Sequence, residues 1–231
     1  MIDLYTDATP NGLKISIALE ELGLAYKAHG LYLGGDQFKP EFSKLNPNKK
    51  IPVIKDDELI LSESGAILLY LAEKTGQLLP TDIAKRAKVI EMLMFQMSGI
   101  GPMFGQYLVF AAAWQNEFPK VTTRYFKEVS RILSVLNKRL DGHEFVAGDE
   151  FTIADIAFIP WINMCLLHPA AADLPLKQNK NVLNWITRML ERPAVIRGMK
   201  VPEPFPPEKQ YEGFVAATIG HGHLHEESEP V

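Results

Sequence analysis

Residues 2–22, IDLYTDATPNGLKISIALEEL, decide the fold of the first part of this chain. Ile2 to Tyr5 is a short apolar run, which predicts a first strand. After polar and turn residues, apolar side chains recur at the spacing i, i+3, i+4, i+7, which predicts one face of a helix. Gly23 follows that pattern at the usual place for a left-handed helix end. The residues of the apolar helix face are Ile15, Ala18, Leu19 and Leu22.

The residues that follow continue an alternation of strands and helices. A second strand is predicted over 25–33 and a short helix around 40–44. Residues 53–55 and 59–61 flank a polar turn, which predicts a hairpin, and a helix is predicted from Ser64 to Lys74. The order βαβαββα over residues 1–76 is that of a thioredoxin-like α/β domain. Residues 77–81 are predicted to be a linker.

Strand signals vanish after the linker, so residues 82–200 are predicted to be an all-helical domain. Thr152 and Asp155 have the spacing of a helix capping box, and a further helix is predicted near residues 181–191. Residues 201–231 are predicted to be an extended, partly disordered tail. Two apolar seams with helical spacing are expected to face the core: Ile83, Ala87, Ile90, Met94, Met97 and Gly101, and then Val129, Leu133, Leu136 and Leu140.

Composition excludes several classes of protein. The 231 residues carry a formal net charge of −4, which argues against a nucleic-acid binder. No apolar run approaches the roughly 18 residues of a membrane span, and no signal peptide is visible. The one cysteine, Cys165, excludes an internal disulfide and is expected to be a buried apolar residue. We therefore expect a reduced, cytoplasmic protein. No metal site is expected, since the histidines of residues 221–225 lie in the predicted tail.

Three motifs give the chain a family resemblance. Thr9-Pro10-Asn11-Gly12, Gly101-Pro102-Met103-x-Gly105-Gln106 and residues 136–140, LNKRL, resemble the bacterial Nu class of the glutathione S-transferases and the related fungal nitrogen-regulator branch. Glu63-Ser64 and Ile51-Pro52 are similar to patterns found across that superfamily. The resemblance spans Met1 to about Met199. It implies the GST fold, glutathione as co-substrate and a homodimer, for which Met92 and Phe95 are apolar candidates for either interface or core.

Thr9 and Asn11 are the predicted catalytic residues. Holding a thiol of pKa about 8.5 as thiolate at neutral pH requires about two pKa units, or about 2.7 kcal/mol. A helix N-terminus supplies about 0.3–2 kcal/mol and a hydrogen bond to a charged group about 1.5–3 kcal/mol, so both together suit the task. The resemblance implies that Thr9 or Asn11 donates to the glutathione sulfur. From the residues alone, both are equally well explained as helix-capping residues.

The tripeptide is expected to bind at two further motifs. The resemblance implies a cis Pro52 that exposes the backbone of Ile51 to the cysteinyl part of glutathione. Ser64 at a helix start suits the γ-glutamyl carboxylate, and Glu63 suits the γ-glutamyl ammonium; both residues also fit a plain helix cap. Candidates for the glycyl carboxylate are Gln37 and Lys50, with Lys49 as an alternative to Lys50.

The helical domain is expected to supply the acceptor side. Pro102 between two glycines predicts a kink, which either opens space above the sulfur or only fits two helices together. Met103, Gln106 and Tyr107 are the predicted lining of the acceptor or second-glutathione site. Arg124 matches an arginine that contacts the second tripeptide in the Nu class, although an arginine on a helix is more often a surface residue.

The resemblance therefore implies a glutathione transferase with disulfide-bond reductase activity. The thiolate would attack either a disulfide, with a second glutathione resolving the mixed disulfide, or a carbon electrophile. The absence of a cysteine near the N-terminus favours disulfide reduction by two borrowed sulfurs. The alternative is a glutathione-fold binding or regulatory protein without turnover.

Overall fold

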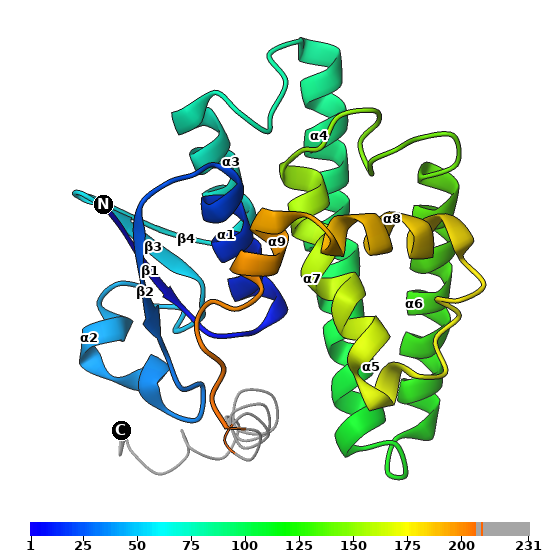
Figure 1. The fold of residues 1–231 in the computed structure, drawn as a ribbon. Coiled ribbons are helices and arrows are strands. Elements are labelled where there is room, and N and C mark those ends of the chain that lie inside the picture. Colours follow the sequence, from blue (N-terminus) through cyan, green and yellow to red (C-terminus); the bar gives the residue numbers. More distant parts are fainter. Residues whose placement is uncertain (207–208, 210–231) are drawn as a thin grey trace.

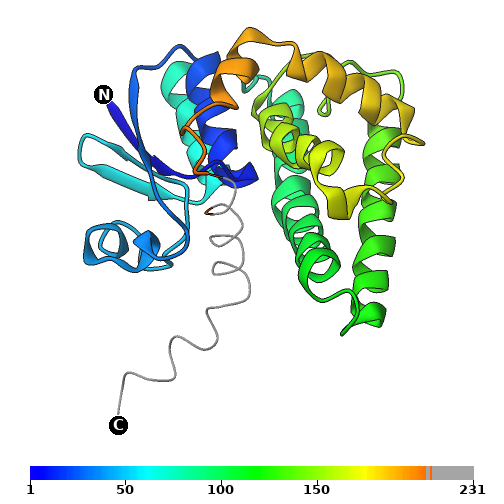
Figure 2. The same cartoon turned by 60° about the horizontal axis from the view of Figure 1, so that its bottom comes forward.

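The computed structural model of this protein describes residues 1–206 and 209. A small sheet with its helices lies beside a larger, all-helical part (Figure 1), and the same separation is plain in the second view (Figure 2). The predicted thioredoxin-like α/β fold followed by an all-α fold is confirmed. The first part consists of β1 (Ile2–Thr6), α1 (Pro10–Glu21), β2 (Tyr26–Gly30), a 3₁₀ turn η1 (Asp36–Phe38), α2 (Pro40–Ser43), β3 (Val53–Asp56), β4 (Leu59–Ser62) and α3 (Ser64–Thr75).

The sheet has the strand order β2-β1-β3-β4, with β1 parallel to β2 and antiparallel to β3. Alternate residues of β1 point to opposite faces. Leu4 is buried in the core, whereas Tyr5 stacks on His29 and approaches Phe42 of α2. The strand predicted over 25–33 is shorter than expected. It ends at Gly30 because its partner β1 ends at Thr6, opposite that residue.

The second part consists of α4 (Ile83–Phe95), a π-helical turn η2 (Gln96–Ile100), α5 (Gly101–Ala113), α6 (Pro119–Arg139), α7 (Ile153–Leu167), a 3₁₀ turn η3 (Pro169–Ala171), α8 (Lys180–Leu190) and α9 (Pro193–Gly198). The predicted seam of α6 is confirmed, since Leu133 and its equivalents are buried. The predicted seam of α4 is wrong. Ile83 is 84% exposed and Met94 46%, and the core is instead contacted by Val89, Met92 and Leu93.

The predicted capping box begins α7. The Thr152 hydroxyl accepts from the Ala154 N–H, and the Asp155 carboxylate accepts from the Thr152 N–H at 3.0 Å. Asp155 also accepts from the Val146 N–H and from the indole of Trp185, each at 3.0 Å. Complete burial raises the pKa of Asp155 to about 6, against the lowering effect of these bonds. Cys165 is buried, as predicted, and Trp185 is buried too.

Helix α9 of the helical part packs on α1 of the sheet part and so connects the two parts. The Ser16 hydroxyl donates to the Gly198 carbonyl at 2.7 Å. A Cβ on Gly198 would lie 2.5 Å from the Cα of Ile17, so only glycine allows this approach. Arg192 adds a two-pronged ion pair with Glu21 of α1. The position of α1 is therefore set from both parts of the chain.

After a turn at residues 199–200, the chain through Pro206 forms neither helix nor strand. It runs back along the sheet part (Figure 1). There the rings of Tyr32 and Phe205 pack edge to face, with their centroids 5.6 Å apart. Two further interpretations of the tail, an aromatic lid from residues 211–214 and the histidines at 221–225, lie outside the described residues.

Candidate active site

The main cleft lies where the start of α1, the start of α3 and the π-helical turn η2 meet. Two adjoining cavities, of about 560 and about 200 Å³, occupy it. Asn11, Glu63 and Ser64 line both, so the two cavities form one continuous site. The motifs at 9–12, 51–52 and 63–64, far apart in sequence, thus meet in space.

Thr9 and Pro10 set the start of α1. Thr9 is the N-cap residue in an extended conformation, and Pro10 occupies the first turn of the helix. The Thr9 side chain makes no capping bond, so the capping interpretation does not account for its hydroxyl. Thr9 is half-buried and is not among the residues that line either cavity. A Cβ on Gly12 would lie 2.2 Å from the Asp7 carbonyl oxygen, so glycine is required for the helix to pack directly on the loop after β1.

Asn11 is held by a residue of the helical part. The indole N–H of Trp161 in α7 donates to the Asn11 Oδ1 at 3.2 Å. An indole N–H can only donate, so the Asn11 carbonyl faces Trp161 and its amide N–H₂ remains available for another acceptor. Asn11 does not cap its helix. Trp161 was not predicted as a site residue. It is buried, but it also orients the predicted donor.

The smaller cavity contains the second motif. The Ile51–Pro52 peptide bond is cis, as the resemblance implied. The preceding loop is shaped by buried Asn46, whose amide donates to the Lys50 carbonyl at 2.7 Å. Lys50 is exposed and lines the cavity. Gln37 is buried, donates to the Leu33 carbonyl and does not line either cavity. Asn46 was not predicted from the sequence.

Glu63 and Ser64 present the N-terminus of α3 to the cleft. Glu63 has a φ of +69°, a region that non-glycine residues rarely occupy and that is often found at functional sites. It makes no side-chain cap, so the first backbone N–H groups of α3 face the cleft without a capping acceptor. These groups and the Ser64 hydroxyl suit an anionic oxygen.

A buried lysine lies behind Ser64. Lys14 is 1% exposed, and its Nζ donates to the Gln96 Oε1 at 2.8 Å and to the Ser64 Oγ at 3.3 Å. Burial lowers the pKa of Lys14 to about 7, and the nearby Glu63 carboxylate partly opposes this effect. Neither Lys14 nor Gln96 was predicted as a site residue. The sequence signal that could have identified Lys14 is its place directly before Ile15, beside the apolar face of the helix.

The acceptor side differs from the prediction in detail. The π-helical turn η2 precedes Pro102, and Pro102 lacks the backbone N–H that a regular helix would use. The turn brings Gln96 into contact with Lys14. Gln106 is exposed and lines the larger cavity. Met103 is half-buried and outside the cavity lining. Tyr107 is 4% exposed, and its hydroxyl donates to the Ala170 carbonyl at 3.0 Å.

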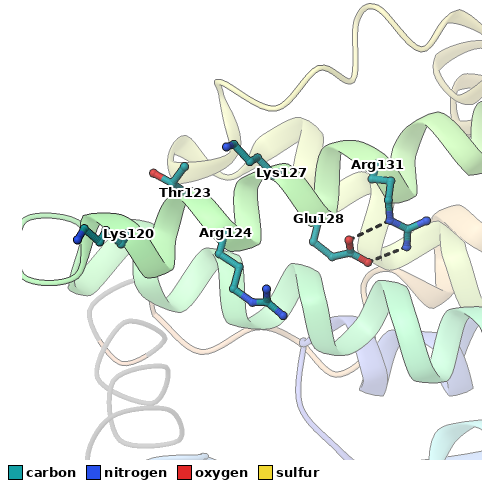
Figure 3. Close-up of a pocket in the computed structure, with 6 residues that line it drawn as sticks. All are labelled: Lys120, Thr123, Arg124, Lys127, Glu128 and Arg131. Carbon is teal, nitrogen blue, oxygen red and sulfur yellow. Dashed lines mark hydrogen bonds and ion pairs between the residues drawn. The ribbon is translucent and has the colours of Figure 1, made fainter.

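Arg124 lies on the exposed face of α6, in a shallow groove separate from the cleft. The side chains of Lys120, Arg124 and Lys127 point in different directions along the helix (Figure 3). Glu128 is paired with Arg131 at 2.7 Å. The structure therefore does not bring Arg124 together with the other predicted site residues of the same chain.

No helix in the described part of the chain is long and apolar enough to cross a membrane. No group of three or more His, Cys, Asp or Glu side chains within residues 1–206 and 209 could hold a metal ion.

Comparison with known proteins places the chain. Residues 4–78 match the family model "Glutathione S-transferase, N-terminal domain", and residues 100–193 match "Glutathione S-transferase, C-terminal domain". The chain is 44% identical to the disulfide-bond oxidoreductase YfcG of Escherichia coli K12, over 84% of this chain and 92% of that protein. It is 32% identical to the transcriptional regulator URE2 of Saccharomyces cerevisiae, over 84% of this chain and 66% of that protein.

Solved structures agree with these relatives. A glutathione transferase family member from Pseudomonas fluorescens Pf-5, with two glutathione bound, is 46% identical with a TM-score of 0.83, covering 87% of this chain and 93% of that one. A glutathione transferase from Pseudomonas putida, with one glutathione disulfide bound per subunit, has the same identity and TM-score, covering 87% and 91%. This chain belongs to the glutathione S-transferase family.

Proposed function

We propose that this protein is a glutathione-dependent enzyme that reduces disulfide bonds. The observation that carries the proposal is the orientation of Asn11. Its carbonyl is occupied by Trp161, so its N–H₂ is the group left to face a sulfur in the cleft. A hydrogen bond to an anion contributes about 1.5–3 kcal/mol, and the N-terminus of α1 adds about 0.3–2 kcal/mol. Together they suit the roughly 2.7 kcal/mol needed to keep the thiolate at neutral pH.

The tripeptide is proposed to bind across the two cavities. Its γ-glutamyl carboxylate would accept from Ser64 and the N-terminus of α3, and its ammonium would pair with Glu63. The backbone of Ile51 would pair with the cysteinyl residue, and exposed Lys50 with the glycyl carboxylate. Thr9 would donate its free hydroxyl to the sulfur, beside Asn11. Gln106 would line the acceptor space.

The reaction is a pair of thiol–disulfide exchanges. The first glutathione thiolate attacks one sulfur of the substrate disulfide, which breaks the S–S bond, forms a mixed disulfide and releases a thiolate that takes up a proton. A second glutathione thiolate attacks the glutathionyl sulfur, forming glutathione disulfide and releasing the second substrate thiol. The name of YfcG and the glutathione or glutathione disulfide in the two Pseudomonas structures support this choice. Arg124 is proposed to contact the second tripeptide, since its guanidinium has no ion pair among the described residues.

We also propose a homodimer and a cytoplasmic location. Met92 and Phe95, the candidates for either interface or core, face the core, and Ile83 and Met94 leave an exposed apolar strip on α4. Covering such a strip favours association of two chains. Light scattering on the purified protein tests the dimer. A cytoplasmic location is supported by the chemistry, which consumes reduced glutathione and is favoured where thiols are kept reduced.

Turnover of hydroxyethyl disulfide with glutathione tests the proposal directly. We expect wild-type activity and a loss of about 10- to 100-fold in kcat/KM for Asn11→Ala. Conjugation of chlorodinitrobenzene without disulfide turnover would favour the transferase reaction. No activity in either assay would favour a binding protein, the alternative that the 32% identity to the regulator URE2 supports.

A further inference from the structure

The unusual feature of the cleft is a buried lysine without an ion-pair partner among the described residues. Lys14 is 1% exposed, and no carboxylate of the described residues lies within ion-pair distance of its Nζ. Its hydrogen-bond acceptors are the neutral groups of Gln96 and Ser64, with the sulfur of Met97 at 3.8 Å. A charge that is buried without a partner is costly, so such a site is normally completed by an opposite charge.

The residues that accept hydrogen bonds from Lys14 line the same cavity as Lys14 itself. Lys14, Ser64 and Gln96 all line the larger cavity together with Asn11. Gln96 is fully buried, and its Oε1 must face the Lys14 ammonium because that group only donates. The Gln96 Nε2 then has no hydrogen-bond partner within the described residues. The polar cluster is therefore incomplete.

We propose that Lys14 is a positioning residue for the γ-glutamyl carboxylate, acting through the Ser64 hydroxyl, and that ligand binding drives proton uptake by Lys14. The Lys14 ammonium donates to the Ser64 Oγ, so the hydroxyl hydrogen points away from Lys14. Its acceptor in this structure is the Met97 sulfur at 3.8 Å, a weak acceptor that a carboxylate in the cavity would replace. A carboxylate at Ser64 supplies the missing negative charge. This inference rests on the proposed function, since it requires that glutathione binds at Ser64.

The charged groups around Lys14 determine its protonation. From the junction of β4 and α3, Glu63 is the charged group that faces it, and the contacts from η2 are the uncharged Gln96 and Met97. Desolvation holds the pKa of Lys14 at about 7 without ligand, so Lys14 is largely deprotonated at pH 8. The ligand ammonium neutralises Glu63, while the ligand carboxylate adds a closer negative charge on the Ser64 side. The net effect raises the Lys14 pKa.

The test is calorimetric titration with S-methylglutathione, which has no thiol to release a proton. Measuring the binding enthalpy at pH 8 in phosphate and in Tris separates the proton uptake from the intrinsic heat. We expect wild-type protein to take up about 0.5–0.9 proton more per ligand than Lys14→Met. Between pH 7 and 9, wild-type affinity should fall by up to about tenfold per pH unit more than that of Lys14→Met, in which only the ligand ammonium titrates.

Steady-state kinetics supply the second readout. Lys14→Met should raise the KM for glutathione about 10- to 100-fold at pH 6.5, with kcat changed less than threefold. Lys14→Gln, which can still donate a hydrogen bond to Ser64, should recover part of the KM without recovering proton uptake. Lys27→Met, at an exposed lysine of β2, is the matched control and should leave both quantities unchanged.

The outcomes separate the two proposals. If wild-type protein binds no S-methylglutathione, the proposed function fails. If wild-type protein binds it but takes up no more protons than Lys14→Met, the assignment of Lys14 is wrong while the proposed function stands. Equal KM values for wild type and Lys14→Met at pH 6.5 would likewise overturn the assignment. Thermal unfolding of each variant shows whether it is folded.

Discussion

Replacing Trp161 with Phe should weaken catalysis by releasing Asn11. The substitution keeps an aromatic ring beside Gly101 and Gly105, where an added Cβ would lie 3.7 and 3.5 Å from the indole. It removes the N–H that donates to Asn11. A neutral hydrogen bond contributes about 0.5–1.5 kcal/mol, which corresponds to a loss of about 2- to 13-fold in kcat/KM. The assay is hydroxyethyl disulfide reduction with saturating disulfide and varied glutathione.

A double-mutant cycle shows whether the loss acts through Asn11. In the Asn11→Ala background, Trp161→Phe should have almost no further effect, because there is no amide left to orient. Trp185→Phe, which removes a buried indole donor outside the cleft, is the matched control. It should change kcat/KM less than twofold at a temperature where the protein is folded. Additive losses from Trp161→Phe and Asn11→Ala would refute the reasoning.

Three further changes have calculable outcomes. Thr9→Ala should lower kcat about 10- to 100-fold while the Kd for glutathione changes less than threefold, and unchanged turnover would remove Thr9 from the mechanism. Asp155→Ala leaves the N–H groups of Val146, Thr152 and Trp185 without their acceptor. It should lower the free energy of unfolding, measured by urea titration, by about 3–5 kcal/mol, and a loss under about 1 kcal/mol would contradict this account. Lys14 has a pKa of about 7 in the folded protein against an ordinary value of 10.5, so the unfolded chain binds this proton more tightly. The free energy of unfolding of the ligand-free protein should therefore rise by about 2 kcal/mol from pH 7 to pH 9, relative to Lys14→Met. A fall over this range would contradict the account.

The thioredoxin-like half could be predicted from the sequence because its signals are local. The apolar run at residues 2–5, the periodic face of α1 and the left-handed Gly23 each depend on nearby residues. The end of β2 could not be predicted in this way, since it is set by the length of its partner β1. The prediction that the apolar seam of α4 faces the core was wrong for a related reason. Periodicity predicts an apolar face, but does not say whether that face meets the core or remains exposed.

The site was predictable where motifs carry it and not where packing creates it. Residues 51–52 and 63–64 lie in the cleft because each is placed by the end of a strand or helix. The contact of Trp161 with Asn11 spans 150 positions, and that of Lys14 with Gln96 spans 82. Both depend on how the helical part docks on α1, which no local pattern encodes. Tyr107 of α5 was predicted to line the acceptor site, but its side chain is buried in the core, where its hydroxyl donates to the Ala170 carbonyl.

The most direct test of the account is an ultraviolet titration of the glutathione thiol bound to the protein. The thiolate absorbs near 240 nm, so its pKa can be measured in the complex. We expect the bound thiol to titrate about two pH units below a free thiol in wild-type protein, and about one to two units higher in Asn11→Ala than in wild type. A bound thiol that titrates like the free tripeptide in wild-type protein would contradict the claim that the start of α1 holds a borrowed sulfur as its anion.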